Sequence, residues 1–257
     1  MNPQHDDGPP AGMSRREWRE RQNSVTAADG PSAPVVPAST PAEDAAPLAA
    51  ILGAPESDAP ASQLTILTVC TGNICRSPLA EVMLRADLEP LGVHVHSAGT
   101  HALVGHGMPE QALELAAQAG VDPATASAHL ARYLVEPLLE EADLVLTMAR
   151  EHRSHVVKMM PNRLRRTFTV REFARLSSTL STDDARAAAD TAGSSPHDRF
   201  AAVLRAVNDQ RGVTPSSGED DDVIDPYRRS RETYARSAAE LTPALVEVER
   251  IVRAALK

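Results

Sequence analysis

Short apolar runs alternate with longer amphipathic segments from residue 64 to the end of the chain. Four runs have the length and apolar character of buried strands, and they cover residues 64–69, 93–98, 143–148 and 166–170. Around them, apolar side chains recur every three or four residues, which predicts helices over 78–89, 109–119, 131–141, 150–160 and 231–256. Such an alternation predicts an α/β fold, with a four-stranded parallel sheet and helices on both of its faces.

One segment breaks this alternation. Residues 175–222 follow the fourth strand, and they carry a helical pattern made by four apolar residues: Phe200, Val203, Leu204 and Val207. The segment ends in the acidic run 219–222, which we interpret as a solvated linker that could also screen anionic substrates. We therefore expect a single catalytic domain over residues 61–257, with a helical and acidic insertion at 175–222.

The first 60 residues have a different composition. They contain ten of the 20 prolines of the chain, mixed with Ala, Ser, Asp and Gly. A stretch with so little apolar surface cannot offset the entropy lost on ordering. We expect residues 1–60 to form a disordered N-terminal arm.

Charge and composition exclude several classes of function. The formal net charge of -9 argues against a nucleic-acid binder, which needs a basic surface. The two cysteines are too few for a disulfide scaffold and suit a reducing compartment. No apolar run has membrane-spanning length, and the nine histidines show no metal-ligand spacing. We expect a soluble, cytoplasmic protein without membrane insertion, bound metal or other cofactor.

The first strand leads directly into the sequence C-T-G-N-I-C-R-S-P at positions 70–78. A loop between an apolar strand and a helix with an early proline is a place where backbone N–H groups converge on an anion. Gly72 and Asn73 tolerate the left-handed backbone that such a loop needs. Arg76 can donate two parallel hydrogen bonds to a phosphate, and together with the helix dipole it favours the thiolate of Cys70. The motif therefore predicts a phosphate-binding loop with a cysteine nucleophile.

This motif resembles that of the low-molecular-weight protein tyrosine phosphatase family, and the similarity covers residues 64–257 apart from the insertion. The resemblance implies a hydrolase in which Cys70 forms a phosphocysteine intermediate and Arg76 binds the phosphate and the transition state. It assigns phosphate binding to the loop residues that follow the nucleophile: Thr71, Gly72, Asn73, Ile74, Cys75, Arg76 and Ser77.

The resemblance also implies a set of supporting side chains. Asn73 matches the residue that maintains the shape of the loop, and Ser77 matches the hydroxyl that supports the thiolate. Ser97 and His129 match family positions that bond to the loop asparagine, although His129 could also be an ordinary capping or surface histidine.

The general acid that the family requires matches Asp225, in the sequence V-I-D-P-Y at 223–227. A phosphocysteine forms only when the leaving oxygen is protonated, and the same carboxylate should then activate the water that hydrolyses the intermediate. Pro226 disfavours a helical backbone at Asp225, which helps to present the carboxylate from a loop. The other Asp-Pro pair, at 122–123, is interpreted as a turn.

Tyr227 is expected at the rim of the site, where its ring would pack on a phosphotyrosine, with His101 or Leu103 opposite. Many family members carry glycine after the aromatic positions, whereas this chain has Arg228, Arg229 and Ser230. These departures bear on which peptide the site prefers and leave the catalytic residues unchanged.

Three alternatives accompany the phosphotyrosine interpretation. An arsenate reductase with a similar loop would need further cysteines downstream to relay the disulfide, and no cysteine follows Cys75. A protein arginine phosphatase of the same family typically has threonine at the position of Ile74, so isoleucine favours phosphotyrosine. A non-catalytic phosphate-binding module is a third possibility, against which the presence of Cys70, Arg76 and Asp225 argues.

The expected partner is thus a tyrosine-phosphorylated protein. Family resemblance further implies redox sensitivity, through a reversible disulfide between Cys70 and Cys75.

Overall fold

The structure is a computed structural model that describes residues 63–215 and 221–257, so the predicted arm over residues 1–60 lies outside it. Four strands form one sheet in the order β2-β1-β3-β4, and every neighbouring pair is parallel. The strands are β1 (Leu64–Cys70), β2 (Val93–Gly99), β3 (Leu144–Thr147) and β4 (Thr167–Thr169). The predicted α/β fold with a four-stranded parallel sheet is confirmed.

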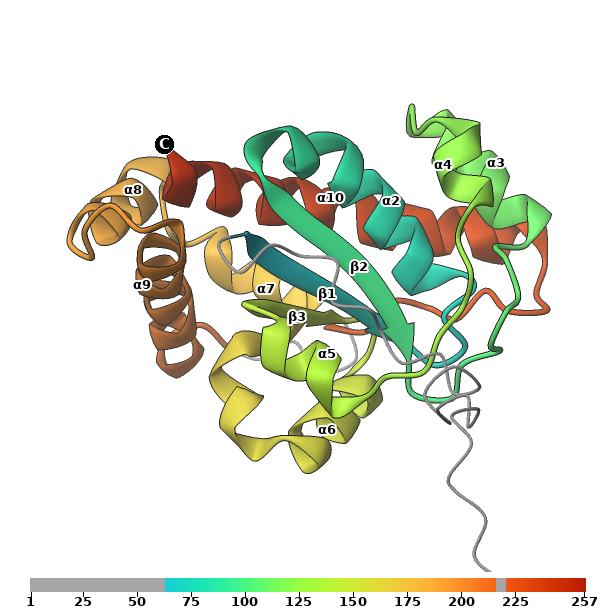
Figure 1. The fold of residues 1–257 in the computed structure, drawn as a ribbon, viewed down its shortest axis with the longest axis horizontal. Coiled ribbons are helices and arrows are strands. Elements are labelled where there is room, and N and C mark those ends of the chain that lie inside the picture. Colours follow the sequence, from blue (N-terminus) through green and yellow to red (C-terminus); the bar gives the residue numbers. More distant parts are fainter. Residues whose placement is uncertain (1–62, 216–220) are drawn as a thin grey trace, which may run out of the picture. The chain divides into compact units, whose positions relative to one another are not determined.

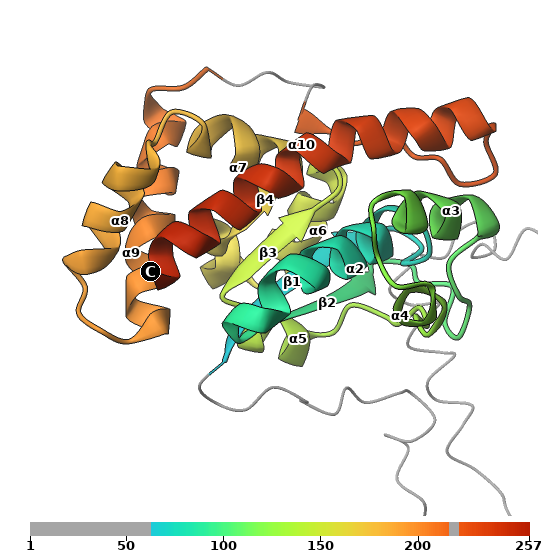
Figure 2. The ribbon, with the colours of Figure 1, turned by 90° about the horizontal axis from the view of Figure 1, so that it is seen from above.

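Helices cover both faces of this sheet (Figures 1 and 2). In chain order they are α2 (Arg76–Leu88), α3 (Glu110–Gln118), α4 (Pro123–Ser127), α5 (Glu136–Glu141), α6 (Arg150–Met159), α7 (Val170–Ser177), α8 (Thr182–Asp190), α9 (Pro196–Asp209) and α10 (Arg231–Leu256). Short 3-10 turns lie at η3 (Glu89–Leu91), η4 (Pro161–Arg166) and η5 (Gln210–Gly212). Helices α2, α7 and α10 pack on one face, and α5 and α6 pack on the other. None of the helices in the described ranges is long and apolar enough to cross a membrane.

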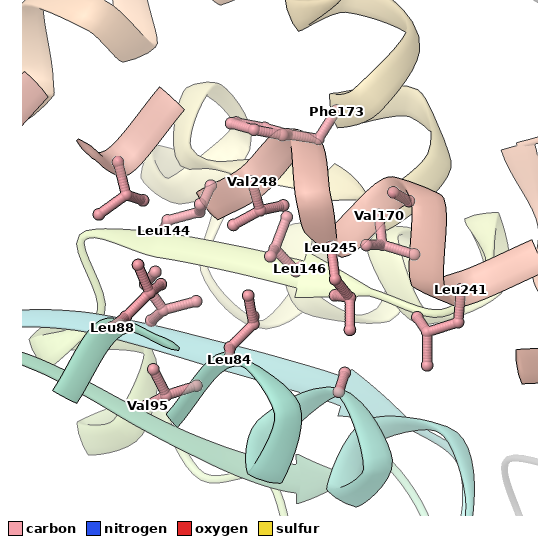
Figure 3. Packing of buried hydrophobic residues seen from close by; sticks show 14 of the residues in the cluster. Leu84, Leu88, Val95, Leu144, Leu146, Val170, Phe173, Leu241, Leu245 and Val248 are labelled. Carbon is pink, nitrogen blue, oxygen red and sulfur yellow. The ribbon is translucent and has the colours of Figure 1, made fainter. Parts of the chain in front are cut away.

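The alternation of side chains along β1 divides them between two cores. Leu64 and Ile66 join a large cluster with apolar residues of α2, α7 and α10, whereas Leu67 and Val69 join a smaller cluster with α5 and α6. Figure 3 shows the larger core, in which apolar side chains of α10 face those of β3 and α2. Because both faces of the sheet are buried, its strands appear in the sequence as nearly continuous apolar runs.

The helix predicted over residues 131–141 is wrong in its first half. Only Glu136–Glu141 is helical, and Pro137 occupies a first-turn position where its missing N–H costs little. Tyr133 instead forms a parallel bridge with Gly99, whose N–H donates to the Arg132 carbonyl at 2.9 Å. Backbone pairing with the end of β2 therefore outweighs helix propensity in this stretch.

Two helix starts also differ from the predictions, because side chains cap them. The strand predicted over 166–170 ends at Thr169, whose hydroxyl accepts the Glu172 N–H at 3.1 Å in a capping box that begins α7. The turn predicted at Asp122–Pro123 is the start of α4, where the Asp122 carboxylate accepts two backbone N–H groups at 3.3 Å.

The segment interpreted as an insertion contains α8 and α9, which pack against each other and against α10. The helix predicted from Phe200, Val203, Leu204 and Val207 is α9, and all four side chains are buried in the larger core. The bounds of the insertion remain a prediction.

The solvated linker predicted at 219–222 is wrong for the two members that the structure describes. Asp221 is 5% exposed, and its carboxylate accepts hydrogen bonds from Arg175 at 2.9 and 3.2 Å. Asp222 accepts the Arg150 backbone N–H at 2.7 Å. Because Arg175 on α7 offsets the cost of burying the Asp221 carboxylate, this part of the acidic run packs on the domain.

Candidate active site

The C-terminal edge of the sheet brings together the residues singled out by the motif. β1 lies between β2 and β3, where the strand order reverses and α/β proteins commonly bind ligands. β1 ends at Cys70, paired with Gly99 of β2, and α2 begins at Arg76. Between them, Asn73 has a φ of 54°, a left-handed conformation that asparagine tolerates better than most residues. Gly72, predicted to tolerate the same conformation, does not adopt it.

The carbonyl groups of this loop are turned away from its centre. The carbonyls of Cys70, Thr71 and Gly72 accept hydrogen bonds from the backbone N–H groups of Thr100, His101 and Leu103, respectively. The Asn73 carbonyl accepts one from His129 Nε2. With the carbonyls turned outward, the N–H groups of the same peptides are directed to the concave side, where they can bind phosphate oxygens. Among the described residues, no group of three His, Cys, Asp or Glu side chains is placed to bind a metal ion.

The Cys70 sulfur accepts two hydrogen bonds in a nearly closed environment. The Ser77 hydroxyl donates to it at 3.0 Å and the Asn73 backbone N–H at 3.3 Å, while the residue is only 3% exposed. Both donors stabilise negative charge on the sulfur, as does the N-terminus of α2. The surroundings of Cys70 therefore suit a thiolate nucleophile.

The Asn73 side chain connects the loop to three other segments. Its Nδ2 donates to the hydroxyls of Ser77 at 3.0 Å and Ser97 at 2.7 Å, and its Oδ1 accepts the Arg132 N–H at 2.9 Å. The structure thus brings together the residues that family resemblance assigned to loop support, including His129. It adds the Arg132 backbone, which carries no signal in the sequence because any residue type supplies an N–H.

Glu81 is a carboxylate behind the loop that the sequence analysis missed, and its side chain is 12% exposed. Its Oε2 accepts the Ser97 hydroxyl at 2.5 Å and lies 3.5 Å from His129 Nδ1. Burial by itself raises the pKa of Glu81, but the hydrogen bonds from His129 and Ser97 outweigh it, and the net pKa is lowered. The charged carboxylate orients the two side chains that bond to Asn73. Its place one helical turn after Ser77 is the signal that would have found it.

Arg76 and Asp225 meet across the mouth of the loop. The Arg76 guanidinium donates to the Val223 carbonyl at 3.1 Å and forms an ion pair with the Asp225 carboxylate at 2.9 Å. Its Nε is buried and makes no hydrogen bond with the rest of the described chain. A buried donor without an acceptor is costly, and a phosphate oxygen would remove that cost.

Asp225 reaches the site from a loop, as its Asp-Pro sequence predicts. Its side chain is 51% exposed, and Oδ1 accepts the Tyr227 N–H at 3.1 Å. This local hydrogen bond limits the rotation of the carboxylate, while Pro226 is buried next to it. Asp225 is therefore oriented by the backbone that follows it and by Arg76.

These residues line one pocket of about 140 Å³. Its walls are Cys70, Thr71, Gly72, Ile74, Cys75, Arg76, His101, Leu103, Asp225 and Tyr227. The structure thus places His101 and Leu103 in the pocket with Tyr227, as expected for a rim. Asn73 and Ser77 belong to the loop but do not line the pocket; both act on it through their hydrogen bonds to the Cys70 sulfur. Ser97 and His129 lie behind the loop and contact Asn73.

His152 is a buried residue that the sequence analysis also missed. Its Nε2 lies 2.8 Å from the Thr71 hydroxyl, and its side chain is 2% exposed. Burial, with the nearby Arg76 charge, lowers the pKa of His152 to about 3, so the ring is neutral over the physiological range. A helical histidine has no distinctive sequence signal, because its contact with Thr71 spans 81 positions of the chain.

Cys75 differs from Cys70 in its surroundings. Its thiol is buried against the Tyr234 hydroxyl at 3.5 Å, and burial raises the pKa of Cys75 to about 11. Both cysteines are free thiols. Cys75 therefore remains a neutral thiol near neutral pH, so it is not a second candidate for the nucleophile that attacks phosphorus.

Gly99 permits the close approach of β2 to the loop. A Cβ at this position would lie 2.5 Å from the Thr71 carbonyl oxygen and 3.0 Å from Asn73 Cβ, so the backbone would have to move. We expect Gly99→Ala to lower kcat/KM for an aryl phosphate at least about tenfold, because displaced catalytic groups lose their alignment. Steady-state kinetics on the folded variant measures the effect.

Gly107 offers the matched control, because a Cβ there would lie 3.5 Å from the nearest atom, the His129 carbonyl oxygen. Gly107→Ala should stay within about twofold of wild type, as expected for ordinary van der Waals contact. Equal losses in both variants would show that the packing at Gly99 is not specific to the loop.

Comparison with known proteins places this geometry in a family. Residues 65–212 match the family model described as low molecular weight phosphotyrosine protein phosphatase. A low-molecular-weight protein-tyrosine-phosphatase of Acinetobacter johnsonii is 38% identical over 103 residues, which are 40% of this chain and 69% of the relative. A protein-arginine-phosphatase of Bacillus subtilis is 35% identical over 112 residues, which are 43% of this chain and 72% of the relative.

A solved structure is similar over a longer stretch. The low-molecular-weight protein tyrosine phosphatase from T. tengcongensis superposes with a TM-score of 0.51 and 29% identity, over 72% of this chain and 97% of that one. The match in sequence begins with the β1–loop–α2 unit, and the match in structure extends to most of the fold. The chain belongs to the low-molecular-weight phosphotyrosine protein phosphatase family.

Proposed function

We propose that this protein is a protein-tyrosine phosphatase that hydrolyses phosphotyrosine through a phosphocysteine intermediate on Cys70. The observation that carries the proposal is the Cys70 sulfur, which accepts hydrogen bonds from Ser77 and Asn73 at the base of the pocket that also contains Asp225. A thiolate, a phosphate-binding arginine and a carboxylic acid in one pocket are the groups that a two-step displacement needs. Membership of the family supports the same chemistry.

In the first step, the Cys70 thiolate attacks phosphorus and the bond from phosphorus to the tyrosine oxygen breaks. Asp225, in its protonated form, donates its proton to that oxygen, so tyrosine leaves as a neutral phenol. The inward N–H groups of the loop and the Arg76 guanidinium stabilise the negative charge on the three equatorial oxygens. The products of this step are dephosphorylated protein and phosphocysteine.

In the second step, water attacks the phosphocysteine and the bond between phosphorus and sulfur breaks. The Asp225 carboxylate accepts a proton from the water, which regenerates the acid for the next cycle. The Ser77 hydroxyl, 3.0 Å from the sulfur, stabilises the departing thiolate by donating its hydrogen bond. Inorganic phosphate and the starting enzyme result.

A protein arginine phosphatase is the second candidate, because the Bacillus subtilis relative carries that activity in its name. Ile74 favours phosphotyrosine instead. Its side chain is 6% exposed and lines the pocket with Tyr227, so it presents an apolar wall beside the phosphate. A charged guanidinium next to Ile74 would have no polar partner there. This loss should lower kcat/KM for phosphoarginine relative to phosphotyrosine by on the order of tenfold to hundredfold.

We expect phosphotyrosine peptides to exceed phosphoarginine peptides in kcat/KM by at least about tenfold, and Ile74→Thr to narrow this gap. Steady-state kinetics with both peptide classes on wild type and variant gives the two ratios. Equal rates on wild type would favour the arginine activity, whereas an unchanged ratio in the variant would show that Ile74 does not set the preference. Absence of hydrolysis of any aryl phosphate by wild type would instead favour a non-catalytic phosphate-binding module.

We also propose a cytoplasmic location and reversible redox control. The two cysteines are free, which supports a reducing compartment such as the cytoplasm. They also lie in one loop, which supports redox control through a disulfide between them. Hydrogen peroxide would oxidise Cys70 to a sulfenic acid and would itself be reduced to water. Attack of the Cys75 thiol on that sulfur, with loss of water, would form the disulfide, and a thiol reductant would restore both groups while becoming a disulfide itself.

A further inference from the structure

Arg228 adopts a backbone conformation that normally belongs to glycine. Its φ is 57°, and it occupies the third position of a β-turn closed by the Arg229 N–H and the Pro226 carbonyl at 2.9 Å. A side chain with a Cβ is strained at this position, where glycine or asparagine is preferred. Within the described ranges, the only other non-glycine residue with a positive φ is Asn73 of the phosphate loop. Strained backbone of this kind clusters at active sites and ligand-binding regions of proteins.

The Arg228 guanidinium lies against the rim of the pocket. Its central carbon is 5.1 Å from the centroid of the Tyr227 ring, which is a cation–π contact. Tyr227 lines the pocket, but Arg228 does not. The guanidinium therefore contacts the ring from outside the pocket, at the place that residues flanking a bound phosphotyrosine would reach.

The charge of Arg228 has no acidic partner among the residues that the structure describes. Two arginines near it in space or sequence are paired, because Arg76 binds Asp225 at 2.9 Å and Arg231 binds Glu114 at 3.0 Å. Arg228 makes no ion pair with any residue in the described part of the chain. A positive group of this kind at a pocket rim, in a chain of net charge -9, can attract an anionic partner.

We propose that Arg228 is a specificity residue that binds an acidic side chain next to the phosphotyrosine of the substrate. The proposal rests on the tyrosine phosphatase activity proposed above. A guanidinium can donate two parallel hydrogen bonds to a carboxylate, and stacking on Tyr227 orients it for that contact. The preferred substrates are then phosphotyrosine segments with glutamate or aspartate beside the modified residue.

Phosphotyrosine peptides with Glu, Ala or Lys beside the modified residue test the proposal. Wild type should prefer the Glu peptide to the Ala peptide by about threefold to fivefold in kcat/KM, the upper range for an exposed ion pair, and the preference should weaken at high salt. Arg228→Gly should bring the Glu-to-Ala ratio close to one. Arg229→Gly removes the same charge one residue away, without a positive φ, and should retain the wild-type ratio.

Stability supplies a second readout. Because glycine relieves the strain, Arg228→Gly should raise Tm by about 2–4 °C, whereas Arg229→Gly should not. A variant that gains stability and loses only the preference for acidic peptides would show that the strain is kept for recognition. Arg228→Asn, which tolerates the same backbone but is less mobile than glycine, should lose the preference equally.

The proposal is overturned if Arg228→Gly keeps the wild-type Glu-to-Ala ratio, or if Arg229→Gly lowers it by the same factor. In the second case the general charge of the loop would decide the preference. A wild type that hydrolyses aryl phosphates but shows no preference for acidic peptides would also overturn it. Failure of wild type to hydrolyse any aryl phosphate would instead contradict the proposed function.

Discussion

Cys70→Ser should lose at least about a thousandfold in turnover of an aryl phosphate, because a serine hydroxyl at this position is almost never ionised near neutral pH. The substitution leaves the hydrogen-bond donors of Ser77 and Asn73 in place, and serine can accept from both. The loop itself is formed by backbone contacts, including those between its carbonyls and the segment after β2. Chemistry should therefore fail while the binding site remains.

Phosphate binding provides the control for this variant. Titration of the folded Cys70→Ser protein with inorganic phosphate should give a Kd within a few-fold of wild type, because the inward N–H groups and Arg76 are unchanged. Loss of both turnover and phosphate binding would mean that the loop has collapsed. Turnover well above a thousandth of wild type, with binding intact, would exclude Cys70 as the nucleophile.

Asp225→Asn should slow hydrolysis of aryl phosphates by about 100-fold to 10,000-fold, the usual contribution of general acid catalysis. The amide cannot donate a proton to the leaving oxygen, and it also loses the ion pair with Arg76. The deficit should shrink as the leaving group improves, because a more acidic phenol needs less protonation. A plot of log kcat/KM against the leaving-group pKa should therefore be steeper for the variant than for wild type.

The chain contains its own control for this experiment, the other Asp-Pro pair. Asp122 caps α4 by accepting two backbone N–H groups, and asparagine is about as good a cap as aspartate. Asp122→Asn should therefore retain activity within about twofold and a normal Tm. If Asp225→Asn lowered all members of the leaving-group series equally, its role would be to position Arg76 rather than to transfer a proton.

The features that can be predicted from the sequence alone are local. The apolar run, the loop and the helix that follow one another over residues 64–88 specify the phosphate-binding unit, because each part depends on neighbours within a few positions. Asn73 was expected to tolerate the left-handed backbone it adopts, for the same reason. Asp225 was found only through the Asp-Pro-Tyr sequence and family resemblance, since a lone carboxylate 155 positions from Cys70 carries no spatial information.

The groups that surround this unit are set by the three-dimensional fold. Glu81 and His152 resemble ordinary helical residues until the loop packs against them and largely buries their side chains. The stretch before α5 forms a bridge with Gly99 rather than a helix, because the end of β2 offers backbone partners that only the assembled sheet provides. Asp221 looked like a solvated acid and is buried, since Arg175 from another helix faces it. Long-range contacts set the free energy of burial at each of these positions, and no local pattern encodes them.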